Sequence, residues 1–265
     1  MGKRSTVRRL RAAEVDAAAY RQHEAERQGL YAIDGGWDPV VEDAGKKGDK
    51  HSEPRREQRY VKTLKPRSEG QAKLIEAIDT CNLVMAVGPA GTGKTYLAIA
   101  KAVEALEKGQ IGRIVLSRPA VEAGESLGFL PGDLEDKLAP YLRPLYDALS
   151  DRLSPKQLRA MMAEGLIEIA PVAYMRGRTL NNAFVVIDEA QNCTYTQIKM
   201  LLTRLGWNST MIITGDPAQS DLLDGLSGLN EAAERLGEIE GIDVIRLHTE
   251  DVVRHPLVAK MLDKL

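Results

Sequence analysis

Apolar and polar positions alternate in blocks from residue 67 onward, and these blocks predict a succession of short strands and longer helices. Short runs that are apolar throughout, such as Leu83–Val87, indicate strands buried on both faces. Strands are expected at residues 83–87, 113–117, 167–170, 184–188, 210–214 and 243–247. Strands of this kind that alternate with helices predict an α/β fold, in which helices cover both faces of a parallel sheet.

Helix boundaries follow from capping residues. Ser68 with Gln71 reads as a capping box that opens a helix to about residue 79, and the pairs at 154/157 and 194/197 open two more. The first of these two has a proline at its first position, and the second should run to about residue 205. Further helices are expected at 96–107, 228–236 and 256–265, and at 133–149 with a break near Pro140 or Pro144.

The chain before residue 67 has a different character. Residues 1–33 are predicted to form a basic helical N-terminal arm with a thin apolar face, and residues 34–66 a polar linker containing glycine and proline. The basic arm could bind a phosphate backbone or sister subunits, or remain solvated. Residues 67–265 form the predicted core domain.

Composition narrows the class of protein. Hydrophobic residues make up 43% and charged residues 28%, as in globular proteins, and the net charge of −2 gives no general case for nucleic acid. Two cysteines, the absence of a secretory signal and the absence of a membrane-length apolar run predict a cytoplasmic protein. The four histidines lack ligand spacing, so no structural zinc is expected, and 5% aromatic residues support a base-stacking platform only weakly.

A glycine-rich segment between a strand and a helix predicts a nucleotide site. Residues 88–95 fit the pattern G-x-x-x-x-G-K-[ST], a loop whose backbone N–H groups surround a phosphate at a helix N-terminus. Lys94 would reach the β- and γ-phosphates, and the Thr95 hydroxyl would bind magnesium. The predicted nucleotide-binding residues here are Gly88, Pro89, Ala90, Gly91, Thr92, Gly93, Lys94, Thr95 and Tyr96, although Tyr96 also reads as a packing residue.

Two later strands end in polar residues that complete this site. Asp188 ends an apolar strand and would hold magnesium, and Glu189 would polarise the attacking water. Asp216 and Gln219 follow the next strand, at the same edge of the sheet, where Gln219 could bind both the γ-phosphate and the water. The same residues also read as an ordinary Asp-Pro turn.

Together these segments resemble the PhoH-like ATPase family, which is itself similar to the first motor core of superfamily-one helicases. The matching segments lie at 88–95, 117–125, 127–132, 174–178, 188–191, 215–219 and 252–256, within about residues 62–265. The resemblance implies a single RecA-like core, ATP and Mg²⁺ as ligands, a hexameric ring, and helicase-like action on RNA or single-stranded DNA.

The resemblance also implies roles for further residues. Gln71 would read the adenine edge, whereas its place in a capping box explains it without a ligand. Arg254 resembles an arginine that contacts the γ-phosphate, and it could instead cap the closing helix. Arg176 and Arg178 would enter a neighbour's site, touch nucleic acid or form a solvated loop, and which arginine acts between subunits, Arg118 included, stays open.

The predicted function is therefore magnesium-dependent ATP hydrolysis, with Lys94, Asp188, Glu189, Gln219 and Arg254 as catalytic residues. Thr95 and Asp188 are the predicted metal ligands. Because a translocating motor needs two cores and this sequence has one, a ring of copies would complete each site. Two alternatives remain: an ATP-gated binding switch with little turnover, and a phosphate-loop kinase.

Overall fold

Strands and helices follow one another along the chain as the apolar blocks predict. The structure is a computed structural model that describes residues 64–119, 134–223 and 225–253. Within these residues the strands are β1 (Leu83–Val87), β2 (Arg113–Arg118), β3 (Ile167–Pro171), β4 (Ala183–Ile187), β5 (Thr210–Gly215) and β6 (Ile242–Arg246). The helices are α2 (Glu69–Thr80), α3 (Lys94–Glu107), α4 (Leu134–Ser150), α5 (Pro155–Ala163), α6 (Tyr195–Leu202) and α7 (Leu229–Leu236).

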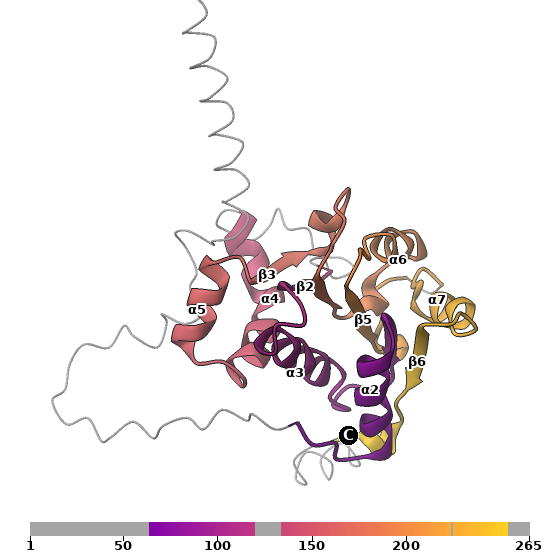
Figure 1. The fold of residues 1–265 in the computed structure, drawn as a ribbon. Coiled ribbons are helices and arrows are strands. Elements are labelled where there is room, and N and C mark those ends of the chain that lie inside the picture. Colours follow the sequence, from indigo (N-terminus) through magenta and orange to yellow (C-terminus); the bar gives the residue numbers. More distant parts are fainter. Residues whose placement is uncertain (1–63, 120–133, 224, 254–265) are drawn as a thin grey trace, which may run out of the picture.

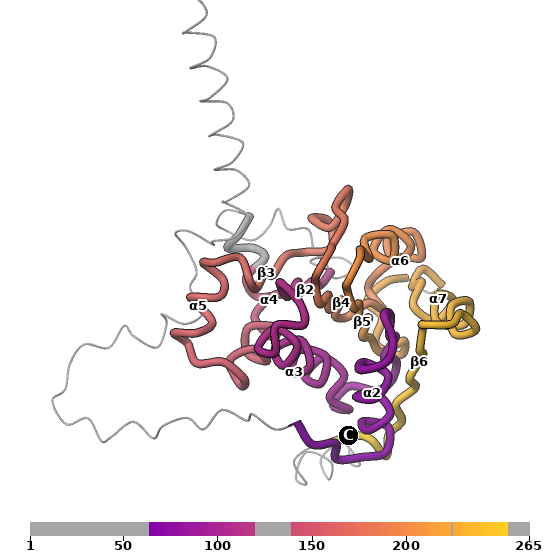
Figure 2. The backbone as a smooth tube through the Cα atoms, in the orientation of Figure 1, coloured from indigo at the N-terminus to yellow at the C-terminus, as the bar shows by residue number. Residues whose placement is uncertain are grey.

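The described strands form one parallel sheet in the order β3-β2-β4-β5-β1-β6. Each neighbouring pair is parallel, and β5 lies between β1 and β4. The backbone trace shows β4 and β5 side by side near the centre of the domain (Figure 2). The carboxyl ends of β1, β4 and β5 therefore meet at one edge of the sheet, which is where ligands bind in folds of this type.

Helices cover both faces of the sheet, as Figure 1 shows. On one face α2, α3, α4 and α5 pack on strand residues such as Val84, Ile114 and Val186. On the other face α6 and α7 pack on residues such as Met85 and Val185, which alternate with the first set along each strand. The predicted α/β class, a RecA-like parallel-sheet core with helices on both faces, is thus confirmed in the residues that the structure describes.

Helix α4 differs from the prediction of a break. It runs without interruption through Pro140 and Pro144. Both prolines are exposed, so water can satisfy the carbonyl groups that lose their helical partners. Leu145 and Leu149 on the opposite side are fully buried in the core, and this packing holds the helix through both prolines.

Helix α6 is shorter than predicted, because it ends at Leu202 rather than near residue 205. The following residues leave the helix to pair with the segment before β4: Leu180 donates its N–H to Arg204, and Gly206 donates to Leu180. Such a tertiary pairing leaves no mark in the local pattern.

Several predicted elements lie outside the described residues: the N-terminal arm, the linker up to residue 63 and the closing helix at 256–265. Residues 64–66, the end of the predicted linker, contain neither helix nor strand. In the part of the chain that the structure describes, the helices are too short or too polar to cross a membrane.

Candidate functional site

The glycine-rich segment forms a tight loop between β1 and α3. Gly88, Gly91 and Gly93 have φ angles of 152°, 84° and 83°, in the region that glycine enters without strain. A Cβ atom at position 88 would lie 2.3 Å from the backbone oxygen of Leu247, so only glycine fits there. The loop therefore has backbone angles that glycine adopts freely and lies directly before α3, as a tight anion-binding loop requires.

Lys94 is the first residue of α3 and lies folded over this loop. Its ammonium donates hydrogen bonds to the backbone oxygens of Gly88, at 2.6 Å, and of Pro89, at 2.8 Å. Burial lowers the pKa of Lys94, while the negative charges of nearby carboxylates, that of Asp216 foremost, act in the opposite direction. The side-chain nitrogen of Lys94 is thus already positioned at the loop, near the carboxylates of Asp216, Glu189 and Asp188.

The loop and the apolar strand that leads into Asp188, a Walker B strand by its pattern, meet through a direct hydrogen bond. The Thr95 hydroxyl donates to Asp188 Oδ1 at 2.5 Å, and the Thr214 hydroxyl of β5 donates to the same oxygen at 2.7 Å. Asp188 itself is 3% exposed. A hydroxyl beside a carboxylate is a donor set that suits a hard cation such as Mg²⁺. Among the described residues no cluster of three or more His, Cys, Asp or Glu could hold a metal, so such a cation would also need water or phosphate ligands.

Glu189 follows Asp188 and has left-handed backbone angles, φ 52° and ψ 41°. This conformation is strained for a residue other than glycine, and strain of this kind gathers at functional sites. Gln191 Nε2 donates to Glu189 Oε2 at 2.5 Å, and Arg118 Nη2 lies 3.6 Å from Oε1. The carboxylate is therefore held on both oxygens.

Gln191 is a residue to which the sequence assigned no role. It is 2% exposed and lies in a 3-10 turn, Ala190–Asn192. Its Oε1 accepts the N–H of Asp216 at 3.0 Å, while its Nε2 also lies 3.4 Å from the backbone oxygen of Gln219. Gln191 thus joins Glu189 to the segment after β5. Its presence in the family motif was the available signal, because no spacing rule points to it.

Asp216 and Gln219 lie at the predicted edge. Asp216 Oδ2 accepts the N–H of Ala90 in the loop, and Oδ1 accepts the N–H of Ala218, each at 3.1 Å. Gln219 ends the 3-10 turn Pro217–Gln219 and is exposed. The Asp-Pro turn and the contact with the loop therefore occur together, since one carboxylate makes both.

Gln71 differs in part from the predicted capping box. Ser68 Oγ accepts the N–H of Gln71, as expected, but the Gln71 side chain does not return to the Ser68 backbone. Its Oε1 accepts from Arg67 N at 2.9 Å, and its Nε2 donates to Thr92 O at 3.0 Å. The amide therefore ties α2 to the glycine-rich loop, which explains why the residue is 5% exposed.

A hollow of about 520 Å³ adjoins Gln71. Its lining residues are Leu64, Lys65, Arg67, Gln71, Tyr96, Leu97 and Val253. Tyr96 is half-buried on this wall and also packs on the core. Val253 donates its N–H to Gly91 O at 2.9 Å, which brings the end of the described chain to the loop. Arg254, the next residue, lies outside the described residues.

The two arginines after β3 differ from each other. Arg178 makes paired hydrogen bonds of 2.5 and 2.7 Å to Glu168, which is 4% exposed on β3. Arg176 is exposed. A guanidinium that donates two hydrogen bonds to a buried carboxylate is poorly placed to reach another subunit. Of the two arginines, only Arg176 therefore remains a candidate for that role.

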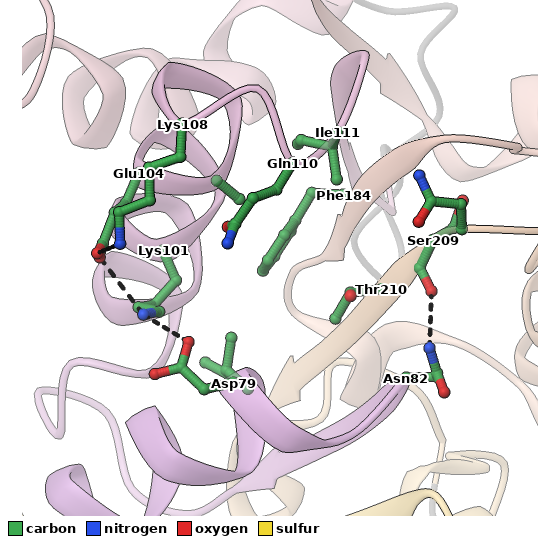
Figure 3. A pocket seen from close by; sticks show the side chains of 13 residues that line it. Asp79, Asn82, Lys101, Glu104, Lys108, Gln110, Ile111, Phe184, Ser209 and Thr210 are labelled. Carbon is green, nitrogen blue, oxygen red and sulfur yellow. Dashed lines mark hydrogen bonds and ion pairs between the residues drawn. The ribbon is translucent and has the colours of Figure 1, made fainter.

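A second hollow, of about 480 Å³, lies at the opposite edge of the sheet, near the amino ends of β4 and β5 (Figure 3). Its charged side chains pair with one another: Lys101 with Asp79 at 2.6 Å, and Lys108 with Glu104 at 2.5 Å. These pairs balance the charges in the hollow, so it offers no net charge that would bind an ion. The predicted site residues that the structure describes lie at the other edge of the sheet.

Known proteins match most of this chain in sequence. The family described as PhoH-like protein matches residues 63–265. A PhoH-like protein of Bacillus subtilis (strain 168) is 59% identical over 203 residues, which cover 76% of this chain and 64% of that protein. Protein PhoH of Escherichia coli (strain K12) is 47% identical over 210 residues, 78% of this chain and 59% of that protein. The chain therefore spans about three fifths of the length of these curated relatives.

Solved structures match at lower levels. The SWI2/SNF2 ATPase core of Sulfolobus solfataricus in complex with dsDNA is 16% identical, with a TM-score of 0.44. The match covers 78% of this chain and 53% of that chain.

Proposed function

Because the chain belongs to the PhoH-like protein family, we propose that it is a magnesium-dependent ATPase whose site lies at the carboxyl edge of β1, β4 and β5. The observation that carries this proposal is the 2.5 Å hydrogen bond from Thr95 to Asp188. It brings the phosphate loop and the Walker B carboxylate together, which is the arrangement that Mg·ATP requires.

Each residue then has a defined task. The loop N–H groups at the start of α3 receive the phosphates, and Lys94 exchanges its two carbonyl partners for phosphate oxygens. Mg²⁺, which enters with ATP, would neutralise charge that develops on the phosphates. Thr95 and Asp188 would hold that cation, and the hollow beside Tyr96 and Gln71 would receive the adenine.

Glu189 would orient the water that attacks the γ-phosphate. Gln191 Nε2 contacts both the Glu189 carboxylate and the backbone oxygen of Gln219, which brings these two residues close together. Glu189 and Gln219 can then orient a water toward the γ-phosphate. Arg254 follows a residue that is hydrogen-bonded to the loop, and it would add positive charge as the phosphate leaves.

We extend the proposal to the assembly. Several copies, in a hexameric ring by family resemblance, would couple hydrolysis to binding or remodelling of RNA or single-stranded DNA. The exposed Arg176 is then a candidate for contact with a neighbouring copy or with the polynucleotide. The two cysteines of the protein are free, which suits the reducing cytoplasm, where we place the protein.

The test is steady-state Mg·ATP hydrolysis with and without single-stranded RNA, on protein whose mass is followed by light scattering. Glu189→Gln should reduce turnover by about 10²–10³-fold and leave ATP binding intact. Glu234→Gln, at an exposed position on α7, is the matched control and should behave as the wild type.

RNA-stimulated hydrolysis by a species of several subunits would support the whole proposal. Tight ATP binding without turnover in the wild type would refute the ATPase and favour the binding switch. Phosphoryl transfer to a small acceptor that exceeds hydrolysis would favour the kinase.

A further inference from the structure

Arg118 occupies a position at the site that the proposed ATPase reaction does not use. It is the last residue of β2, next to β4 in the sheet. Its guanidinium lies 3.7 Å from Asp188 Oδ2 and 3.6 Å from Glu189 Oε1, so one cation faces both Walker B carboxylates. Its side chain is 19% exposed, a setting in which such charge interactions are only partly screened.

The two oxygens of Asp188 have different partners. Oδ1 accepts the hydroxyls of Thr95 and Thr214, whereas Oδ2 faces Arg118. A divalent cation held by Asp188, directly or through water, needs carboxylate charge that is not already neutralised. The guanidinium and the cation therefore compete for the same carboxylate.

The backbone keeps Arg118 at this place. The N–H of Asp188 donates to Ser117 O at 2.8 Å, and Ser117 pairs with Ile187 in the sheet. The Cα of Arg118 is thus fixed relative to Asp188 by two paired strands. Its long side chain can rotate away from the carboxylates without any change in the sheet, and a guanidinium stays charged when it moves.

We propose that Arg118 and the divalent cation of the nucleotide exchange on the Walker B carboxylates, so that Arg118 sets the cation affinity of the site. Before the nucleotide enters, Arg118 offsets the repulsion between Asp188 and Glu189. When the cation arrives, the guanidinium is displaced. This role rests on the proposed Mg·ATP site. In that site, Arg118 stabilises the two carboxylates while the metal is absent.

Metal binding can be measured without turnover. The full-length protein is saturated with ADP, Mn²⁺ is titrated as the probe, and free Mn²⁺ is read by electron paramagnetic resonance. Removal of the competing charge in Arg118→Gln should lower the Kd for Mn²⁺ by about tenfold, equivalent to about 1.4 kcal/mol. Arg118→Lys retains the charge and should lie close to the wild type. Arg113→Gln changes an arginine at the other end of β2, about 17 Å away, and is the matched control.

Thermal unfolding of the same variants gives a second measurement. Without metal and nucleotide, Arg118→Gln should melt below the wild type, because two neighbouring carboxylates lose their shared cation. Saturating Mn·ADP should remove most of that difference, whereas a purely structural role would leave it unchanged.

The outcomes separate the two proposals. A wild type that binds Mn·ADP, with an Arg118→Gln Kd that is unchanged or higher, would refute the exchange and leave the ATPase standing. A wild type that binds no Mn·ADP would refute the ATPase site and the exchange with it.

Discussion

Gln191 offers a sharp test of how the site is held together. Gln191→Glu keeps the size and shape of the side chain and keeps an oxygen that can accept the Asp216 N–H. It replaces the amide group that donates to Glu189 Oε2 at 2.5 Å with a second carboxylate oxygen. The substitution therefore removes the hydrogen bond to Glu189 and the longer one, of 3.4 Å, to the backbone oxygen of Gln219. It also adds one like charge at a residue that is 2% exposed.

The magnitude follows from these contacts. Loss of a hydrogen bond to a charged group lowers stability by about 1.5–3 kcal/mol. In a domain of this size, about 2 kcal/mol corresponds to a fall in Tm of about 4–8 °C. The like charge raises the pKa of one carboxyl of the pair in the folded state, so the folded protein binds more protons than the unfolded chain. The deficit relative to the wild type should then shrink as the pH falls.

The turnover number kcat should also fall. Loss of the partner that orients the general base is expected to lower kcat by about 10²-fold. The Kd for ADP should stay within about threefold, because Gln191 touches neither the loop nor Thr95 in the described contacts. Urea unfolding, ATP hydrolysis and ADP titration measure the three quantities. Gln197→Glu is the matched control, since a capping box accepts either residue at that position. If Gln191→Glu hydrolyses ATP within about threefold of the wild type, Gln191 does not orient Glu189.

Three further predictions concern other parts of the structure. Gly88→Ala should abolish nucleotide binding and lower the yield of folded protein, because its Cβ would lie 2.3 Å from a backbone oxygen beyond β6; ADP titration and circular dichroism test this. Burial raises the pKa of the Cys193 thiol to about 12, so at pH 8 a thiol reagent should label the half-buried Cys81 first and Cys193 only on unfolding. The Ser68 side chain and nearby backbone N–H groups lower the pKa of Asp251, so its contribution to stability is present above about pH 4 and lost as the pH falls below that; Asp251→Asn should flatten this part of the stability curve.

The motifs of the nucleotide site could be placed from the sequence because each joins a strand end to a known chemistry. An apolar run before Gly88 and another before Asp188 set both at the carboxyl edge of a parallel sheet, and the structure places them there. Local capping signals were also reliable: Ser154 and Thr194 each begin a helix with both bonds of a capping box.

The side-chain contacts between elements could not be predicted, because they depend on how separate elements pack together. The pairing of Arg178 with Glu168 depends on how β3 and its following turn meet, and the pairing of Arg118 with Asp188 depends on strand order. Gln71 shows the limit of a local rule. Ser68 caps α2 as expected, but Gln71 Oε1 accepts the N–H of Arg67 rather than that of Ser68. Its Nε2 donates to Thr92 O in the glycine-rich loop, 21 residues away.

The place of β5 has a consequence for folding. The loop after β1 and the carboxylate after β4 belong to strands that are not neighbours, since β5, residues 210–215, is inserted between them. Without β5 the two strands could not stand about 10 Å apart, at twice the normal strand spacing. The chain must therefore pair strands that are far apart in the sequence before any nucleotide can bind. This long-range pairing should be a slow step. In a refolding experiment, the return of nucleotide affinity would report the insertion of β5 rather than the earlier formation of helices.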